Sequence, residues 1–129
     1  MAETHSIEKR ALELLRQRLV SQGRSVQPSD NKTFDLIVDG QYAEVKAKDK
    51  PFRAFDFFFM SENQYRAVLE GPEFLLFLVC GVADASGVQI FEIPSARLRS
   101  LHPKSETHYY YDKGLVDQLL RFGGSATTK

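Results

Sequence analysis

The stretch that decides the fold, residues 33–48, reads TFDLIVDGQYAEVKAK. Two short alternating runs, 34–38 and 42–48, flank Asp39-Gly40. An Asp-Gly pair between such runs is a strong signal for a two-residue hairpin turn. We therefore expect a β-hairpin, in which Val38 pairs with Gln41 and the register continues back along both strands.

That register places Asp35 directly opposite Glu44. Like charges in this position destabilise an antiparallel pair, because their Cβ atoms lie only about 4.5 to 5.5 Å apart. Lys46 shares the face of Glu44, since strand side chains alternate. The opposite face is apolar and is expected to enter the core; it carries Phe34, Leu36, Val38, Ala43 and Val45. One face of the hairpin is suited to the core and the other to chemistry.

Length and charge limit the function classes. The chain has 129 residues, 43% of them apolar, which is enough for one ordinary core. We expect a single domain over 1–122 and a flexible C-terminal tail over 123–129, GGSATTK. Seventeen basic and seventeen acidic residues cancel, which argues against a general polyanion binder. Any contact with nucleic acid must therefore be local.

Cysteine content and hydropathy indicate the compartment. Cys80 is the only cysteine, so a disulfide framework within the chain is excluded. The first ten residues contain no apolar signal core, and the longest apolar run, 74–83, is too short to span a bilayer as a helix. We expect a soluble cytoplasmic protein. Cys80 has no basic neighbour in sequence, which favours a small buried hydrophobe over a nucleophile.

The remaining pattern predicts one mixed sheet flanked by helices, an α/β fold of the α+β mixed-sheet kind. Ser61 and Gln64 fit a capping box, and Asp112 fits the cap of the last helix. The first half of the chain is expected to form a helix over 6–22, a strand over 24–27, the hairpin, and a strand or approach to a helix over 55–60. A helix to about 69 then leads to a central strand over 74–82 and a strand over 88–93. The chain is expected to end with a short helix over 94–101, a strand-like piece over 107–111 and a helix containing 115–120. We interpret the Phe-rich run 55–60 as core; base stacking by some of its rings is the alternative.

One carboxylate on the first helix stands out. Glu8 falls inside the apolar stripe, between Leu15 and Leu19, where a charge needs a partner. The helix dipole or a nearby basic residue is one explanation. Another is a shared cation, because Asp35 and Glu44 offer the one or two carboxylates that Mg²⁺ or Mn²⁺ requires.

These residues together suit phosphodiester hydrolysis. The main-chain carbonyl of Val45 is a further candidate ligand, and Lys46 could orient a water or neutralise charge that develops on phosphorus. The three histidines, His5, His102 and His108, lack the spacing of metal ligands, so zinc is not expected.

Phe34-Asp35 followed by Glu44-Val45-Lys46 resembles the D-x(n)-(D/E)-x-K signature of the PD-(D/E)XK nuclease superfamily. The resemblance covers roughly residues 6–93, because the superfamily's restriction-endonuclease-like core has the order helix, three strands, helix, strand. It implies that Asp35 and Glu44 bind metal and that Lys46 is catalytic. Glu8 matches a helix Glu of several branches, including Holliday-junction resolvase-like ones. The Pro before Asp is missing here, since Phe34 occupies its position, and that Pro is dispensable in many branches of the superfamily.

The resemblance implies a metal-dependent DNA endonuclease, and a nuclease of this size could act as a homodimer. Candidate contacts to nucleic acid are Lys48, Lys50, Arg53 and Gln64, although the basic residues also suit a solvated loop and Gln64 also suits a helix cap. Two other functions stay open: a non-catalytic module of this fold that binds nucleic acid or a partner protein, and a toxin- or immunity-type interaction protein.

Overall fold

Two β-sheets of unequal size organise the chain, and the computed structural model describes residues 2–83, 87–105, 109–121 and 125–128. The larger sheet has six strands in the order β1 (Val26–Pro28), β2 (Leu36–Val38), β3 (Gln41–Ala47), β5 (Leu75–Cys80), β6 (Gln89–Pro94) and β9 (Ser125–Thr128). The smaller sheet places β8 (Tyr109–Asp112) between β4 (Phe57–Met60) and β7 (Lys104–Ser105). Strands β3 and β5 run parallel, and the other paired strands are antiparallel.

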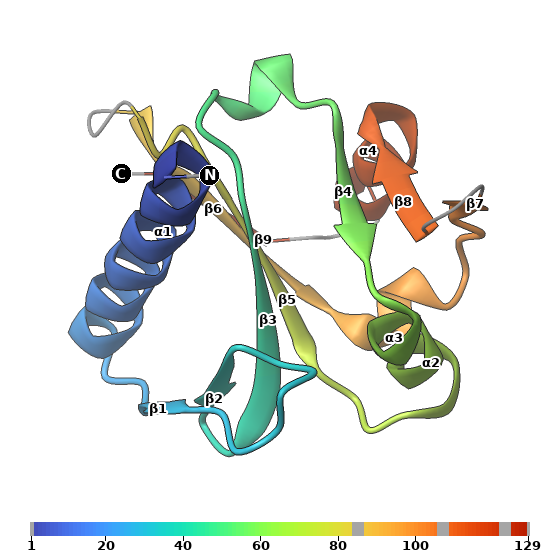
Figure 1. Ribbon diagram of the computed structural model, residues 1–129, viewed down its shortest axis with the longest axis horizontal. Coiled ribbons are helices and arrows are strands. Elements are labelled where there is room, and N and C mark those ends of the chain that lie inside the picture. Colours follow the sequence, from blue (N-terminus) through green and yellow to red (C-terminus); the bar gives the residue numbers. More distant parts are fainter. Residues whose placement is uncertain (1, 84–86, 106–108, 122–124, 129) are drawn as a thin grey trace.

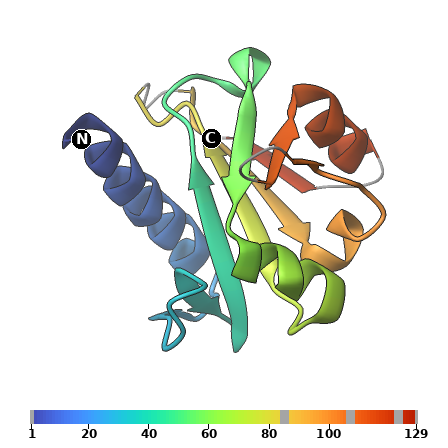
Figure 2. The same ribbon diagram turned by 45° about the vertical axis from the view of Figure 1, so that its right-hand side comes forward.

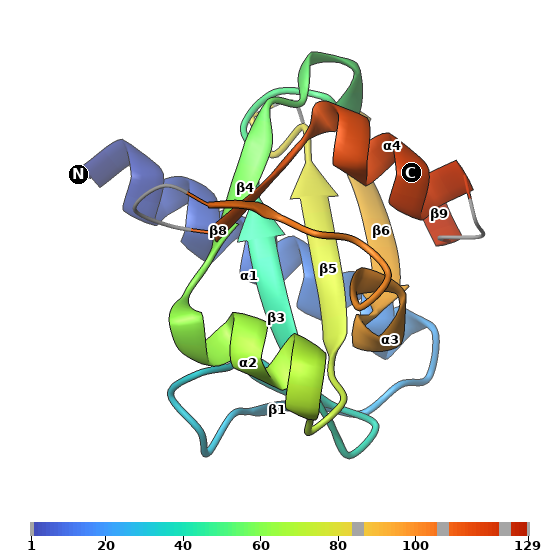
Figure 3. The same cartoon turned by 90° about the vertical axis from the view of Figure 1, so that its right-hand side faces the viewer.

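Helices and the small sheet cover the two faces of the large sheet (Figure 1). The long helix α1 (Ala2–Ser21) packs on one face through Ala11, Leu15 and Leu19. The other face is covered by the small sheet together with α2 (Glu62–Glu70), α3 (Ser95–Leu98) and α4 (Lys113–Arg121), which lie in front of the large sheet in Figure 3. A short 3₁₀ turn, η1 (Phe52–Ala54), leads into β4.

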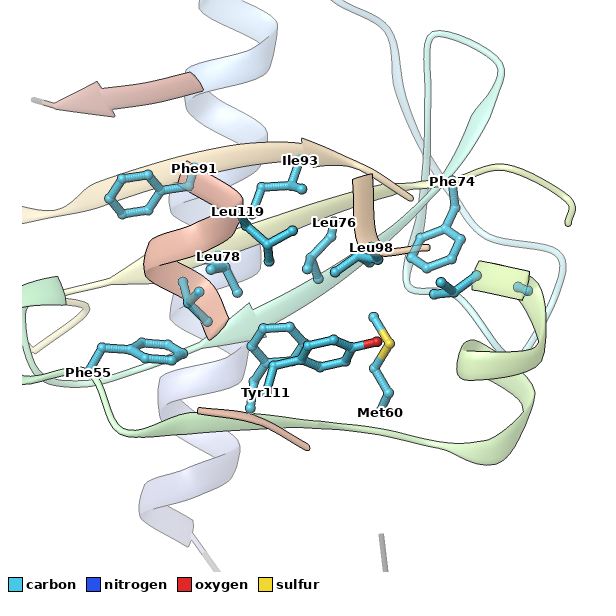
Figure 4. Packing of buried hydrophobic residues seen from close by; sticks show 14 of the residues in the cluster. Phe55, Met60, Phe74, Leu76, Leu78, Phe91, Ile93, Leu98, Tyr111 and Leu119 are labelled. Carbon is cyan, nitrogen blue, oxygen red and sulfur yellow. The ribbon is translucent and has the colours of Figure 1, made fainter. Parts of the chain in front are cut away.

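Aromatic and aliphatic side chains together fill the core between the two sheets (Figure 4). Phe58 of β4 stacks on Tyr111 of β8, with ring centroids 5.0 Å apart. Both rings are buried, and they belong to the same cluster as Leu76 and Leu78 of β5. The small sheet is therefore joined to the large one by shared core packing.

Most elements confirm the expected order, including the mixed sheet flanked by helices. The hairpin turns at Asp39-Gly40 with Val38 opposite Gln41. Both residues of the turn have positive φ, as a two-residue turn of this kind requires. Helix α2 begins with the predicted capping box of Ser61 and Gln64. Strand β5 is fully buried between β3 and β6, as its continuous apolar run indicates.

The hairpin differs from the prediction where it opens. Strand β2 begins at Leu36, so Asp35 is not a ladder partner of Glu44, whose partner is Leu76 of β5. The chain turns before this point, because the Phe34 N–H donates to the Asn31 carbonyl. Phe34 therefore does not share the face of Leu36 and joins the cluster on the other side of the sheet.

Two further segments differ from the prediction. Part of the expected tail, Ser125–Thr128, forms β9 and pairs with β6 as an edge strand. The aromatic run 55–60 yields β4, which joins a separate sheet, and only part of it is core: Phe55, Phe58 and Met60 are buried, whereas Phe59 is exposed. The expected turn at 84–87 and the start of the piece at 107–111 lie largely outside the described residues.

Cys80 is buried, and burial raises the pKa of its thiol to about 12, as expected for a structural cysteine. No helix in the described ranges combines the length and hydrophobicity that crossing a bilayer requires.

Candidate active site

An open strand edge forms the floor of the candidate site. Strand β2 pairs with β3 only over residues 41–43, and among the described residues no other strand pairs with 44–47 on that side. A cleft of about 610 Å³ lies along this edge. Its walls are α1 on one side and β4 on the other, which flank β3 in Figure 2. All four residues predicted to bind metal line this cleft, and so does Lys46; the four are Glu8, Asp35, Glu44 and Val45.

Asp35 reaches the open edge from the loop that precedes β2. Its Oδ2 accepts a hydrogen bond of 2.9 Å from the Val45 N–H, while its own N–H donates to the Ala43 carbonyl. The N–H and C=O of one strand residue point to the same edge. The Val45 carbonyl therefore faces the edge at which the Asp35 carboxylate lies.

Glu44 is the buried carboxylate of the site. It is only 6% exposed, and its Oε2 lies 3.0 Å from the Lys46 Nζ. Burial raises the pKa of Glu44 to about 7; the Lys46 ammonium opposes this rise and the nearby Asp35 carboxylate adds to it. The two carboxylates thus interact although they are not ladder partners, and the expected shared face of Glu44 and Lys46 is confirmed.

Gln64 fixes the ammonium of Lys46. Lys46 Nζ donates to Gln64 Oε1 at 3.2 Å, and the same oxygen accepts from the Ser61 N–H in the capping box. The Gln64 side-chain amide donates to the Thr33 carbonyl at 3.0 Å. Gln64 is buried and so connects the start of α2, the loop before Asp35 and the lysine. This placement agrees with the helix-cap interpretation, and only 8% of Gln64 is exposed.

Two carboxylates and one carbonyl in the cleft are donors of the type that Mg²⁺ or Mn²⁺ prefers. Mg²⁺ is commonly held by one or two carboxylates and keeps several waters, and Asp35, Glu44 and the Val45 carbonyl are candidate ligands of that kind. Burial of Glu44 beside a second carboxylate is costly without a cation, and Lys46 is the cation that the structure contains.

Glu8 does not complete a three-carboxylate site. Across 2–83, 87–105, 109–121 and 125–128, no group of three or more His, Cys, Asp or Glu side chains is placed to hold a metal ion. Glu8 lines the cleft beside Leu12 and is exposed, so the sheet does not bury this part of the apolar stripe of α1. Among residues 6–21 of α1, Ala11 is the first buried one, and Glu8 and Leu12 on either side of it line the cleft.

The predicted nucleic-acid contacts lie at different depths. Lys48 lines the cleft, where its Nζ lies 3.0 Å from Asp56 and 4.8 Å from the centre of the Phe57 ring. Lys50 and Arg53 are exposed on the segment that leads away from β3 to η1. The basic segment therefore starts inside the cleft and continues onto the surface.

The aromatic wall of the cleft was not predicted as part of the site. Residues 57–59 of β4 line it together with Lys46 and Lys48. The alternation of the Phe run could have indicated that only every second ring is buried. Its position beside β3 depends on the second sheet, which no local pattern reveals.

Comparisons of the chain with models of protein families, with curated proteins and with solved structures gave no match.

Proposed function

We propose that the protein is a nuclease that depends on Mg²⁺ or Mn²⁺ and hydrolyses phosphodiester bonds, most simply as a DNA endonuclease. One observation carries the proposal: Asp35, Glu44 and Lys46 meet in a cleft at an open strand edge, with Lys46 Nζ 3.0 Å from Glu44. The chain order of a helix, strands with a hairpin, a helix and a further strand parallel to β3 is what a restriction-endonuclease-like core requires, and it supports the same proposal.

Each residue has a defined task. Asp35, Glu44 and the Val45 carbonyl would hold the cation, which supplies Lewis acidity to the phosphate and lowers the pKa of a bound water. Lys46 directs its ammonium into the cleft, where it can donate to a phosphate oxygen and offset the charge that develops on phosphorus. Gln64 keeps that ammonium in place through its 3.2 Å contact and thus acts as a positioning residue.

The direct test is cleavage of plasmid and oligonucleotide DNA with Mg²⁺ by the wild type and by Lys46→Ala. The variant removes the Lys46 ammonium from the cleft and changes only this side chain of β3. We expect the cleavage rate to fall by about 10²-fold or more, the usual effect of removing a group that stabilises charge in the transition state. Glu44→Gln should give a similar loss because a neutral amide is a poor ligand for Mg²⁺.

Glu13→Gln is the matched control, since Glu13 is an exposed carboxylate on α1 outside the cleft. Circular dichroism establishes that each variant is folded. A folded Lys46→Ala protein that cuts as fast as the wild type would exclude the nuclease. DNA retention without cleavage or metal binding would instead identify a non-catalytic module.

A further inference from the structure

The outer face of the small sheet carries three aromatic rings. Strand alternation turns Phe58 and Met60 into the core and leaves Phe57 and Phe59 on the opposite face of β4. Tyr110 of β8 is the ladder partner of Phe59 and lies on that same face. We call Phe57, Phe59 and Tyr110 the aromatic platform.

The three rings form one connected surface. Phe57 and Phe59 have ring centroids 4.8 Å apart, and Tyr110 lies 6.1 Å from Phe57 and 6.3 Å from Phe59. All three contacts are edge-to-face. Phe59 is 47% exposed, although the solvent side of an antiparallel sheet usually carries polar residues. Phe57 and Tyr110 are half-buried beside it, and neighbouring apolar rings on a solvent face are a candidate binding surface.

The platform continues directly into the candidate active site. Phe57 and Phe59 are part of the cleft wall that also contains Glu44 and Lys46. Lys48 joins the two regions, with its Nζ 4.8 Å from the Phe57 ring centre. Its carboxylate partner Asp56 is 61% exposed, so a phosphate can take the place of that ion pair.

Aromatic faces beside lysines are the chemistry that binds single-stranded nucleic acid. Exposed bases stack on the rings in a way that tolerates any sequence, while the lysines hold the phosphates. A duplex cannot use such a platform, because its bases are already stacked and paired. We propose that the aromatic platform binds unpaired bases and leads a single strand into the cleft; as a statement about substrate class, this rests on the proposed function.

The test measures binding in EDTA, so that cleavage does not enter. Fluorescence anisotropy compares a labelled thymidine oligonucleotide with a labelled hairpin duplex that carries the same number of phosphates. We expect tighter binding of the single strand by the wild type. Phe59→Ala should weaken that binding by about 5- to 150-fold, the loss of one stacked base, and leave duplex binding unchanged.

Two variants separate stacking from loss of structure. Phe59→Tyr keeps a ring and should bind the single strand as the wild type does. Val20→Ala trims another exposed apolar side chain, at the far end of α1, and should change neither affinity. Lys48→Gln should lower the salt dependence of binding, which Phe59→Ala leaves intact, because only the lysine contacts phosphate.

Equal wild-type affinity for single strand and duplex would overturn the inference, and so would a Phe59→Ala protein that binds the single strand like the wild type. Cleavage that depends on Glu44 together with either result would leave the nuclease standing and remove the platform. Single-strand binding that depends on Phe59, in a protein that cuts no DNA with Mg²⁺, would keep the platform and remove the nuclease.

Discussion

Glu44 combines burial, a cation and a second carboxylate at one position. It lies 3.0 Å from Lys46, and both burial and Asp35 favour its protonated form. A buried carboxylate next to another is an unfavourable arrangement for stability alone. A divalent cation bound by both carboxylates would explain why Glu44 lies next to Asp35 at the open edge of β3.

The raised pKa of Glu44 predicts how stability depends on pH without metal. Between the ordinary value of 4.5 and about 7, the folded protein holds one more proton at Glu44 than the unfolded chain does. The free energy of unfolding should therefore fall as pH rises through this window, by at most about 3 kcal/mol. Glu44→Gln should lack this component. Urea unfolding in EDTA from pH 5 to pH 8 checks it, and parallel pH profiles for the two proteins would contradict it.

For single residues, the sequence predicted which side chains come together in the cleft better than it predicted how deeply each is buried. Asp35, Glu44 and Lys46 do share one cleft: strand alternation places Glu44 and Lys46 on one face of β3, and the loop before β2 brings Asp35 to its edge. The exposure of Glu8 could not be foreseen, since helical periodicity says which side of α1 is apolar and not where the sheet beneath it ends.

The capping box of α2 links an element's stability to the candidate site. Ser61 and Gln64 cap the same helix, but only Gln64 contacts Lys46. Ser61→Ala should cost about 0.5 to 2 kcal/mol of stability and leave cleavage by the folded protein unchanged. Gln64→Ala should lower the rate constant for cleavage as well, because the lysine loses its hydrogen-bond acceptor.

Saturating cleavage kinetics, combined with urea unfolding, separates the two effects. Rescue of the rate in Gln64→Glu, which keeps an acceptor for Lys46, would identify positioning as the cause. Equal cleavage by both alanine variants would show that Gln64 serves the helix alone.

The Asp39-Gly40 turn made the hairpin predictable from Leu36 onwards, but not for the residues that precede Leu36. Asp39-Gly40 fixes the register of the three pairs next to the turn. The departure before Leu36 depends on the loop, where the Phe34 N–H bonds to Asn31, and on the stacking of Phe34 against Tyr42 at 4.9 Å. Those tertiary contacts outweigh strand alternation and turn Phe34 to the other face.

The two sheets should unfold together, because Phe58 and Tyr111 join the small sheet to the core of the large one. Phe58→Ala should lower the free energy of unfolding by about 3 to 5 kcal/mol, the usual cost of removing a buried Phe. Far-ultraviolet circular dichroism and tyrosine fluorescence should give coincident urea transitions in both proteins. A separate early transition in the wild type would mean that the small sheet is an independent unit.

The pairing of the small sheet and the pairing of the edge strand β9 could not be predicted from the sequence, and the reason is the same for both. Strand β4 pairs with β8, from Met60 with Tyr109 to Phe57 with Asp112, although the two strands are far apart in the sequence. Strand β9 pairs with β6 from the segment expected to be a tail. Local propensity identifies a strand but not its partner, so neither pairing could be derived from periodicity. The aromatic platform is a product of the first of these pairings.

A Mn²⁺ titration followed by electron paramagnetic resonance tests the central claim most directly, because it measures the cation site without requiring a substrate. We expect one Mn²⁺ per chain in the wild type and in Glu13→Gln. Affinity should fall by more than about 10-fold in Glu44→Gln and in Asp35→Asn, since even residues that only support metal ligands cause losses of that size. Equal Mn²⁺ affinity in the wild type and both site variants would contradict the account.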